Sequence, residues 1–68
     1  MKLTVNDVKK AIEHIESIQG DDEAAHSAED SLRNTVLEAI ASGNAINGKA
    51  CAQEVLRTND IHFYRWKA

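Results

Sequence analysis

A chain of 68 residues, 43% of them apolar and 28% charged, has room for one small domain with a thin core. Its single cysteine, Cys51, excludes an internal disulfide and a cysteine-based zinc site within one chain, and no apolar stretch approaches the ~18 residues of a membrane span. The net charge of −3 is uneven, because residues 13–38 hold eight acids and one base, whereas residues 57–68 are basic and aromatic. We therefore expect one cytoplasmic domain, residues 1–68, with no signal peptide.

The first predicted helix covers residues 5–19. Thr4 is suited to cap it, and Asp7 completes a capping-box pattern. Apolar residues recur at spacings of three and four, the pattern of a helix face that packs against another helix. We predict that this face is a core or dimer seam, with the dimer interface made by Val5, Val8, Ile12 and Ile15.

Three further elements follow in the C-terminal direction. A second helix is predicted at 22–42, with Asp21 as its cap and Gly43 closing it. A third, at 48–57, follows Asn47 and buries Cys51, and a short helix or turn is predicted at 59–66. The fold class is therefore all-α: a compact three-helix domain with a short C-terminal fourth helix or turn.

The size of the chain also favours a homodimer. Ordering a chain costs roughly 1.5 kcal/mol per residue, which is on the order of 100 kcal/mol here. A core of 14 larger aliphatic side chains, without a disulfide, barely offsets that cost. Association of two copies buries apolar surface that a monomer leaves in water.

Residues 21–30 read DDEAAHSAED, and two site readings can be drawn from them. Glu23 and His26 form a Glu-x-x-His pair, as in di-iron helical bundles. Alternatively, a stripe at spacings of four, three and four is a solvated, ion-paired helix face or a surface for a basic protein partner. The residues of this stripe are Asp22, His26, Glu29 and Arg33.

The helical wheel separates these two readings. We expect Val36, Leu37 and Ile40 to define the apolar face of the second helix. When this face is extended toward the N-terminal end of the helix, it passes through the stripe. Glu23 lies to the side of it. We therefore expect no resident metal, and no cofactor, although a dimer brings two copies of His26 within the reach of one ion.

The segment IHFYRWKA at 61–68 holds every aromatic ring of the chain. It either folds back over the core or supplies binding anchors, because Arg and Trp are enriched at interface hot spots. The anchors would be Arg65 and Trp66. Stacking of bases on these rings is a further reading, which the acidic segment at 13–38 opposes.

Three segments, DDEAAHSAEDSL, VLEAIASG and LRTNDIHFYRW, resemble a set of very small, largely uncharacterised helical proteins of phages, prophages and their bacterial hosts, including lambdoid early-region accessory proteins. The resemblance spans about residues 21–66. It implies an accessory or regulatory role and carries over no catalytic residue. The positions it highlights are Glu23, His26, Glu29, Asp30, Thr58, Ile61, Phe63, Arg65 and Trp66.

One structural hypothesis joins both motifs: Arg65 pairs with an acid of the Ala-Glu-Asp stretch at 28–30 and clamps the tail onto the second helix. Of the positions that the resemblance highlights, Thr58 is then expected to be a helix cap and Ile61 a packing residue.

We expect a non-enzymatic accessory protein that binds an unknown host or phage protein, without a nucleic-acid or membrane partner. No Gly-rich phosphate loop or nucleophile constellation is present. The alternatives are a nucleic-acid-binding regulator and a metal-binding helical dimer. The predicted partner-binding residues are Asp22, His26, Glu29, Asp30, Arg65 and Trp66.

Overall fold

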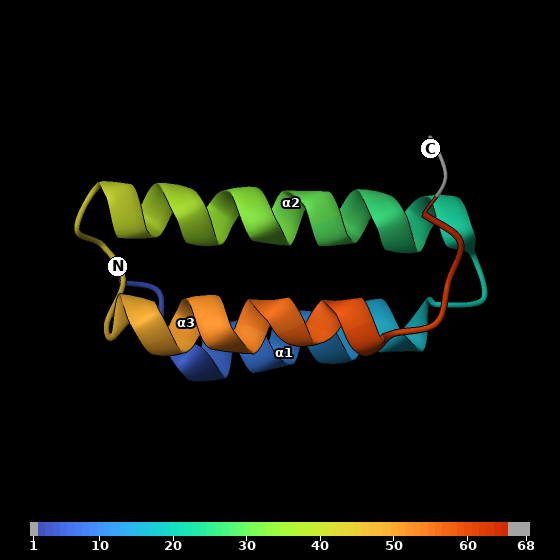
Figure 1. Ribbon diagram of the computed structural model, residues 1–68, viewed down its shortest axis with the longest axis horizontal. Helices are drawn as coiled ribbons and strands as arrows, with labels where there is room; N and C mark the ends of the chain where they lie inside the picture. Colours follow the sequence, from blue (N-terminus) through green and yellow to red (C-terminus); the bar gives the residue numbers. More distant parts are fainter. Residues whose placement is uncertain (1, 66–68) are drawn as a thin grey trace.

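The computed structural model describes residues 2–65, and within that range the fold is all-α. Three α-helices are followed by one short 3₁₀ helix: α1 (Val5–Ser17), α2 (Asp22–Ala41), α3 (Gly48–Val55) and η1 (Leu56–Asp60). Each α-helix contacts the other two, and α2 is the longest (Figure 1). From Asp60 the chain crosses back to the first turns of α2 (Figure 1).

The helix starts are those predicted from the caps. Thr4 and Asp7 form the expected capping box, with the Asp7 amide donating to Thr4 Oγ1 over 3.2 Å and the Thr4 amide donating to Asp7 Oδ2 over 2.9 Å. Asp21 Oδ1 accepts from the Ala24 amide, and Asn47 Oδ1 accepts from the Ala50 amide. Each cap satisfies a backbone donor that a helix terminus leaves unpaired.

The helix ends differ slightly from the predictions. α1 ends at Ser17, two residues early, because the amide of Ile18 already bonds Ile15 in a tighter turn. α2 ends at Ala41, and Gly43 adopts φ +77, which a residue without Cβ reaches without strain. α3 stops at Val55 and continues as η1, so the short helix or turn predicted at 59–66 is a 3₁₀ helix that begins at Leu56, three residues early, and ends at Asp60.

A single parallel bridge ties the N-terminal segment to the α2–α3 loop. The Leu3 amide donates to Asn44 O and the Ile46 amide donates to Leu3 O, each over 2.8 Å. This contact holds the start of α1 against the end of α2.

The core lies where the three helices meet, and every α-helix contributes to it. Its buried apolar side chains are Val8, Ile12, Ile15, Ala25, Leu32, Val36, Cys51, Val55 and Ile61. Burial of Cys51 and Ile61 confirms the predictions for both residues.

The predicted dimer interface on α1 is wrong. Val8, Ile12 and Ile15 are at most 3% exposed in one chain, and Val5 is half-buried beside them. Their face is already covered by α2 and α3, so it offers nothing to a second molecule. The dimer itself stays a prediction and needs another surface.

The predicted apolar face of α2 is partly wrong as well. Val36 is buried, but Leu37 is 65% exposed and Ile40 is 39% exposed. The buried line follows Ala25, Glu29, Leu32 and Val36, which turns Leu37 about 100° away from the core.

No helix in the described part of the chain combines the length and the apolar character that crossing a membrane requires.

Candidate functional site

Glu29 is the one acid that α2 carries into the core, at 2% exposure. Its carboxylate is held by a fork of hydrogen bonds from Arg65. Arg65 Nε donates to Oε1 over 2.9 Å and to Oε2 over 3.2 Å, and Nη2 donates to Oε2 over 2.9 Å. This geometry confirms the predicted clamp between Arg65 and the Ala-Glu-Asp stretch, and identifies the acid as Glu29.

The same guanidinium organises the chain that leads up to it. Nη2 also donates to the carbonyl oxygens of Thr58 and Ile61, and Nη1 to that of Phe63 over 3.5 Å. The Phe63 ring lies under the guanidinium, 3.9 Å from Cζ to the ring centroid. Residues 61–65, after the end of η1, therefore fold around their own arginine, and this explains why they are not helical.

A second arginine, Arg33, lies on the other side of Glu29 and contacts the same C-terminal segment. Arg33 Nη2 donates to Thr58 Oγ1 over 3.1 Å and to Asn59 Oδ1 over 2.7 Å, and it lies 3.9 Å from Glu29 Oε2. Thr58 is fully buried between the two arginines and is not a helix cap as predicted. We name the group Glu29, Arg33, Thr58 and Arg65 the tail lock.

The electrostatics of the tail lock favour ionised groups. Burial acts to raise the pKa of the Glu29 carboxyl, but hydrogen bonds from Arg65 and Thr58 and the charges of both arginines outweigh it, so that pKa lies below its ordinary value. The hydrogen bonds to Glu29 raise the pKa of Arg65 in turn. A carboxylate and a guanidinium that saturate each other in this way are poor candidates for catalysis or for a ligand.

The predicted partner surface is therefore divided by the structure. Glu29 and Arg65 are engaged with each other, which corrects their assignment as partner-binding residues. Asp22 is exposed, and its Oδ1 accepts from the Tyr64 amide over 3.0 Å, which anchors the tail a second time. Trp66 lies outside the described residues.

His26 pairs with Asp30 at 3.6 Å, not with Asp22 as the stripe predicted. Asp30 is exposed, and His26 is half-buried. Among residues 2–65, no cluster of three or more His, Cys, Asp or Glu side chains is arranged to hold a metal ion.

A different surface collects the apolar side chains that the core does not use. Leu37 on α2 and Leu56 at the start of η1 are 65% and 57% exposed, and both line a hollow of about 250 Å³ between α2 and α3. We name this surface the leucine face. The residues that line its hollow are Arg33, Val36, Leu37, Ala52, Val55 and Leu56.

Sequence reasoning missed the leucine face, although a signal for it exists. The dipeptide Val-Leu occurs at 36–37 and again at 55–56, and neighbouring residues on a helix point about 100° apart. In each pair the valine is buried and the leucine is not. Two adjacent apolar residues on a narrow helix face therefore indicate a second apolar surface.

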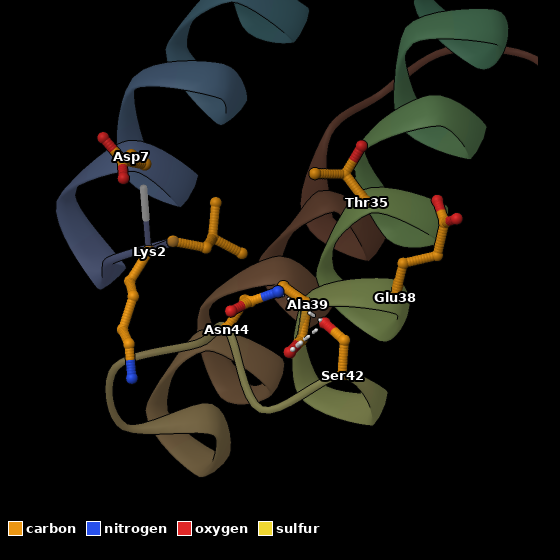
Figure 2. A pocket seen from close by; sticks show the side chains of 8 residues that line it. Lys2, Asp7, Thr35, Glu38, Ala39, Ser42 and Asn44 are labelled. Atoms are coloured by element: carbon orange, nitrogen blue, oxygen red, sulfur yellow. Dashed lines mark hydrogen bonds between the residues drawn. The ribbon is translucent and has the colours of Figure 1, made fainter.

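A larger hollow of about 510 Å³ lies between the start of α1 and the end of α2 (Figure 2). Two hydrogen bonds join some of its polar groups: Asn44 Nδ2 donates to Ser42 Oγ over 3.0 Å, and Ser42 Oγ donates to Ala39 O over 3.3 Å (Figure 2). Asp7 is engaged in the α1 cap with Thr4. The residues that line it are Lys2, Leu3, Asp7, Thr35, Glu38, Ala39, Ser42 and Asn44.

No family model, curated protein or solved structure matches the chain. The two distinctive regions of the described chain are the tail lock and the leucine face.

Proposed function

We propose that this chain is a non-enzymatic accessory or regulatory protein of the phage or prophage type, and that it acts by binding protein through its leucine face. The observation that carries the proposal is the exposure of Leu37 and Leu56 on either side of one apolar hollow. Scattered apolar residues are ordinary on a protein surface, but large ones that gather around a hollow are typical of protein-binding sites.

The composition of the leucine face supports a protein partner. Of the described residues that line the hollow, Arg33 alone is charged; its Nη2 is bonded to Thr58 and Asn59, whereas its Nε has no hydrogen-bond partner. A partner therefore meets a lining that is apolar apart from one guanidinium, which suits the apolar core of a protein interface. The phage-type setting rests on the resemblance of residues 21–66 alone.

The tail lock, which shares Arg33 with the leucine face, also supports the proposal. It joins residues 58–65 to α2 and so holds η1, with Leu56 at its start, in place. A rigid scaffold beneath an apolar patch lowers the entropic cost of binding, because fewer groups are ordered when the partner arrives.

Site-specific photo-crosslinking in bacterial cells tests this function. A photoreactive residue at position 37 is expected to give a covalent adduct with a protein. The same residue at Lys9, an exposed position on α1, serves as the control and is expected to give none. Absence of any adduct at both positions 37 and 56, with the chain folded and expressed, would overturn the proposal.

A further inference from the structure

We propose that the occupant of the leucine face is a second copy of this chain, which forms a two-fold symmetric dimer through α2, α3 and Leu56. This inference rests on the proposed function and names the partner at the same site. Three features of the described residues carry it: the shape of the face, the distribution of charge, and the area that a dimer requires.

The leucine face combines protruding apolar side chains with a hollow that could receive such side chains. Leu37 and Leu56 are exposed side chains, and the hollow of about 250 Å³ between them is lined by smaller ones, including Ala52 and Val55. A two-fold interface must be self-complementary, because the same patch occurs on both sides. Projecting leucines and a hollow on one patch satisfy that condition, since each copy inserts a leucine into the hollow of the other.

The charge of the chain restricts where two copies can meet. Each copy has a net charge of −3, and residues 13–38 carry most of the acids. Two copies that approach through exposed acids, such as Asp22, Glu23 and Asp30 on α2, repel each other. No acid of the described residues lines the hollow of the leucine face, and the Arg33 that does line it lies 3.9 Å from Glu29, so two copies can meet there without opposing their exposed acids.

The area that a stable dimer requires is also within reach. A standard interface buries about 800 Å² per partner, which is roughly a sixth of the 4601 Å² surface of the chain. Three helices that all contact one another enclose three side faces, and the leucine face is one of them. Ile40, 39% exposed beside Gly48 of α3, extends it toward the α2–α3 loop.

Sedimentation velocity of the purified full chain tests the dimer directly. The wild type is expected to shift from 7.5 kDa to about twice that mass as concentration rises from about 1 µM to about 1 mM. Leu37→Asp is expected to weaken association at least ~10-fold, because it places a charge in an interface that is otherwise apolar. Leu56→Ser is a milder second variant if Leu37→Asp does not fold, as judged by circular dichroism.

The matched control is Thr35→Asp, which adds the same charge to an exposed position on the same helix, beside the α1–α2 hollow. It is expected to leave the dimer intact. A wild type that stays at 7.5 kDa throughout, or a dimer that Leu37→Asp and Leu56→Ser both leave unchanged, would overturn the inference.

The crosslinking experiment separates this inference from the proposed function. An adduct at position 37 of twice the chain mass, reproduced with the purified chain alone, supports the dimer. An adduct of another mass, with a monomeric purified chain, refutes the dimer and leaves protein binding at the leucine face standing. No adduct at either leucine refutes both.

Discussion

Each half of α2 contains a residue whose burial is the opposite of what its side-chain type suggests. The first half is charged, yet its central acid, Glu29, is buried and saturated by Arg65. The second half is apolar, yet Leu37 faces water. In the charged half the central acid is thus closed off while Asp22, Glu23 and Asp30 stay exposed, and the apolar half leaves a large aliphatic side chain uncovered.

The difference has a simple physical basis. A buried carboxylate is stable only if hydrogen-bond donors replace the water it has lost. In this chain the donors come from the protein itself, so the carboxylate has no capacity left for another partner. An exposed leucine has no such requirement, and its apolar area becomes favourable as soon as another apolar surface covers it. The proposed binding surface therefore rests on residues without a partner inside the fold, and not on the conspicuous charges.

The largest expected effect is at the tail lock. Glu29→Ala or Arg65→Ala should each lower the free energy of unfolding by about 3 kcal/mol, because each leaves the other charge without its partner. Urea unfolding at neutral pH measures this loss. The double variant should cost less than the sum of the two single losses by more than ~1 kcal/mol, and simple additivity would contradict the lock.

Arg65→Lys is the matched control for charge. Lysine keeps the positive charge but has no planar fork, so it cannot bond Glu29 and the Thr58 and Ile61 carbonyls together. We expect it to recover less than half of the stability that Arg65→Ala loses. Full recovery would show that charge alone holds the tail.

Two leucines on the same helix provide the next comparison. Leu32→Ala should lower the free energy of unfolding by about 3 kcal/mol, since Leu32 is buried in the core. Leu37→Ala should change it by less than about 0.5 kcal/mol in the monomer, as expected of a surface position. Thermal and urea unfolding at low protein concentration measure both, and equal losses would place Leu37 in the core.

A smaller effect is expected from the second arginine of the tail lock. Arg33→Ala removes the hydrogen bonds to Thr58 and Asn59 and should cost about 1 kcal/mol. Asn59→Ala, which removes one of these two bonds, should cost less. A loss at Arg33 as large as that at Arg65 would mean that the two arginines share the lock equally.

The smallest effect is the pH dependence of the tail lock. Because the folded pKa of Glu29 is lowered from 4.5, its contribution to stability is fully present above pH 4.5 and is lost as pH falls through the lowered value. The stability advantage of wild type over Glu29→Gln should therefore shrink as pH falls below 4.5. An advantage that grows on acidification would show that the pKa is raised.

Much of the fold could be predicted from local pattern. The caps Thr4, Asp21 and Asn47 fall at the predicted helix starts, since a cap is a contact between neighbours in the chain. The pairing of Arg65 with the Ala-Glu-Asp stretch was also predictable, because a cation and a nearby helix of acids leave few choices. Whether Glu29 or Asp30 is buried depends on the rotation of α2 about its axis. The sequence pattern predicted an apolar face that included Leu37, and this face is rotated away from the one that is buried.

The amino-acid sequence by itself determined the helical class, the helix starts and the burial of Val8, Ile12 and Ile15, because these follow from periodicity and from contacts within a few residues. Tertiary structure decided what those residues pack against. It made the α1 face a core instead of a dimer seam, folded residues 58–65 around Arg65, and left Leu37 and Leu56 in water. Each of these outcomes depends on how three helices share one small core, and a thin core cannot cover every apolar side chain that the sequence provides.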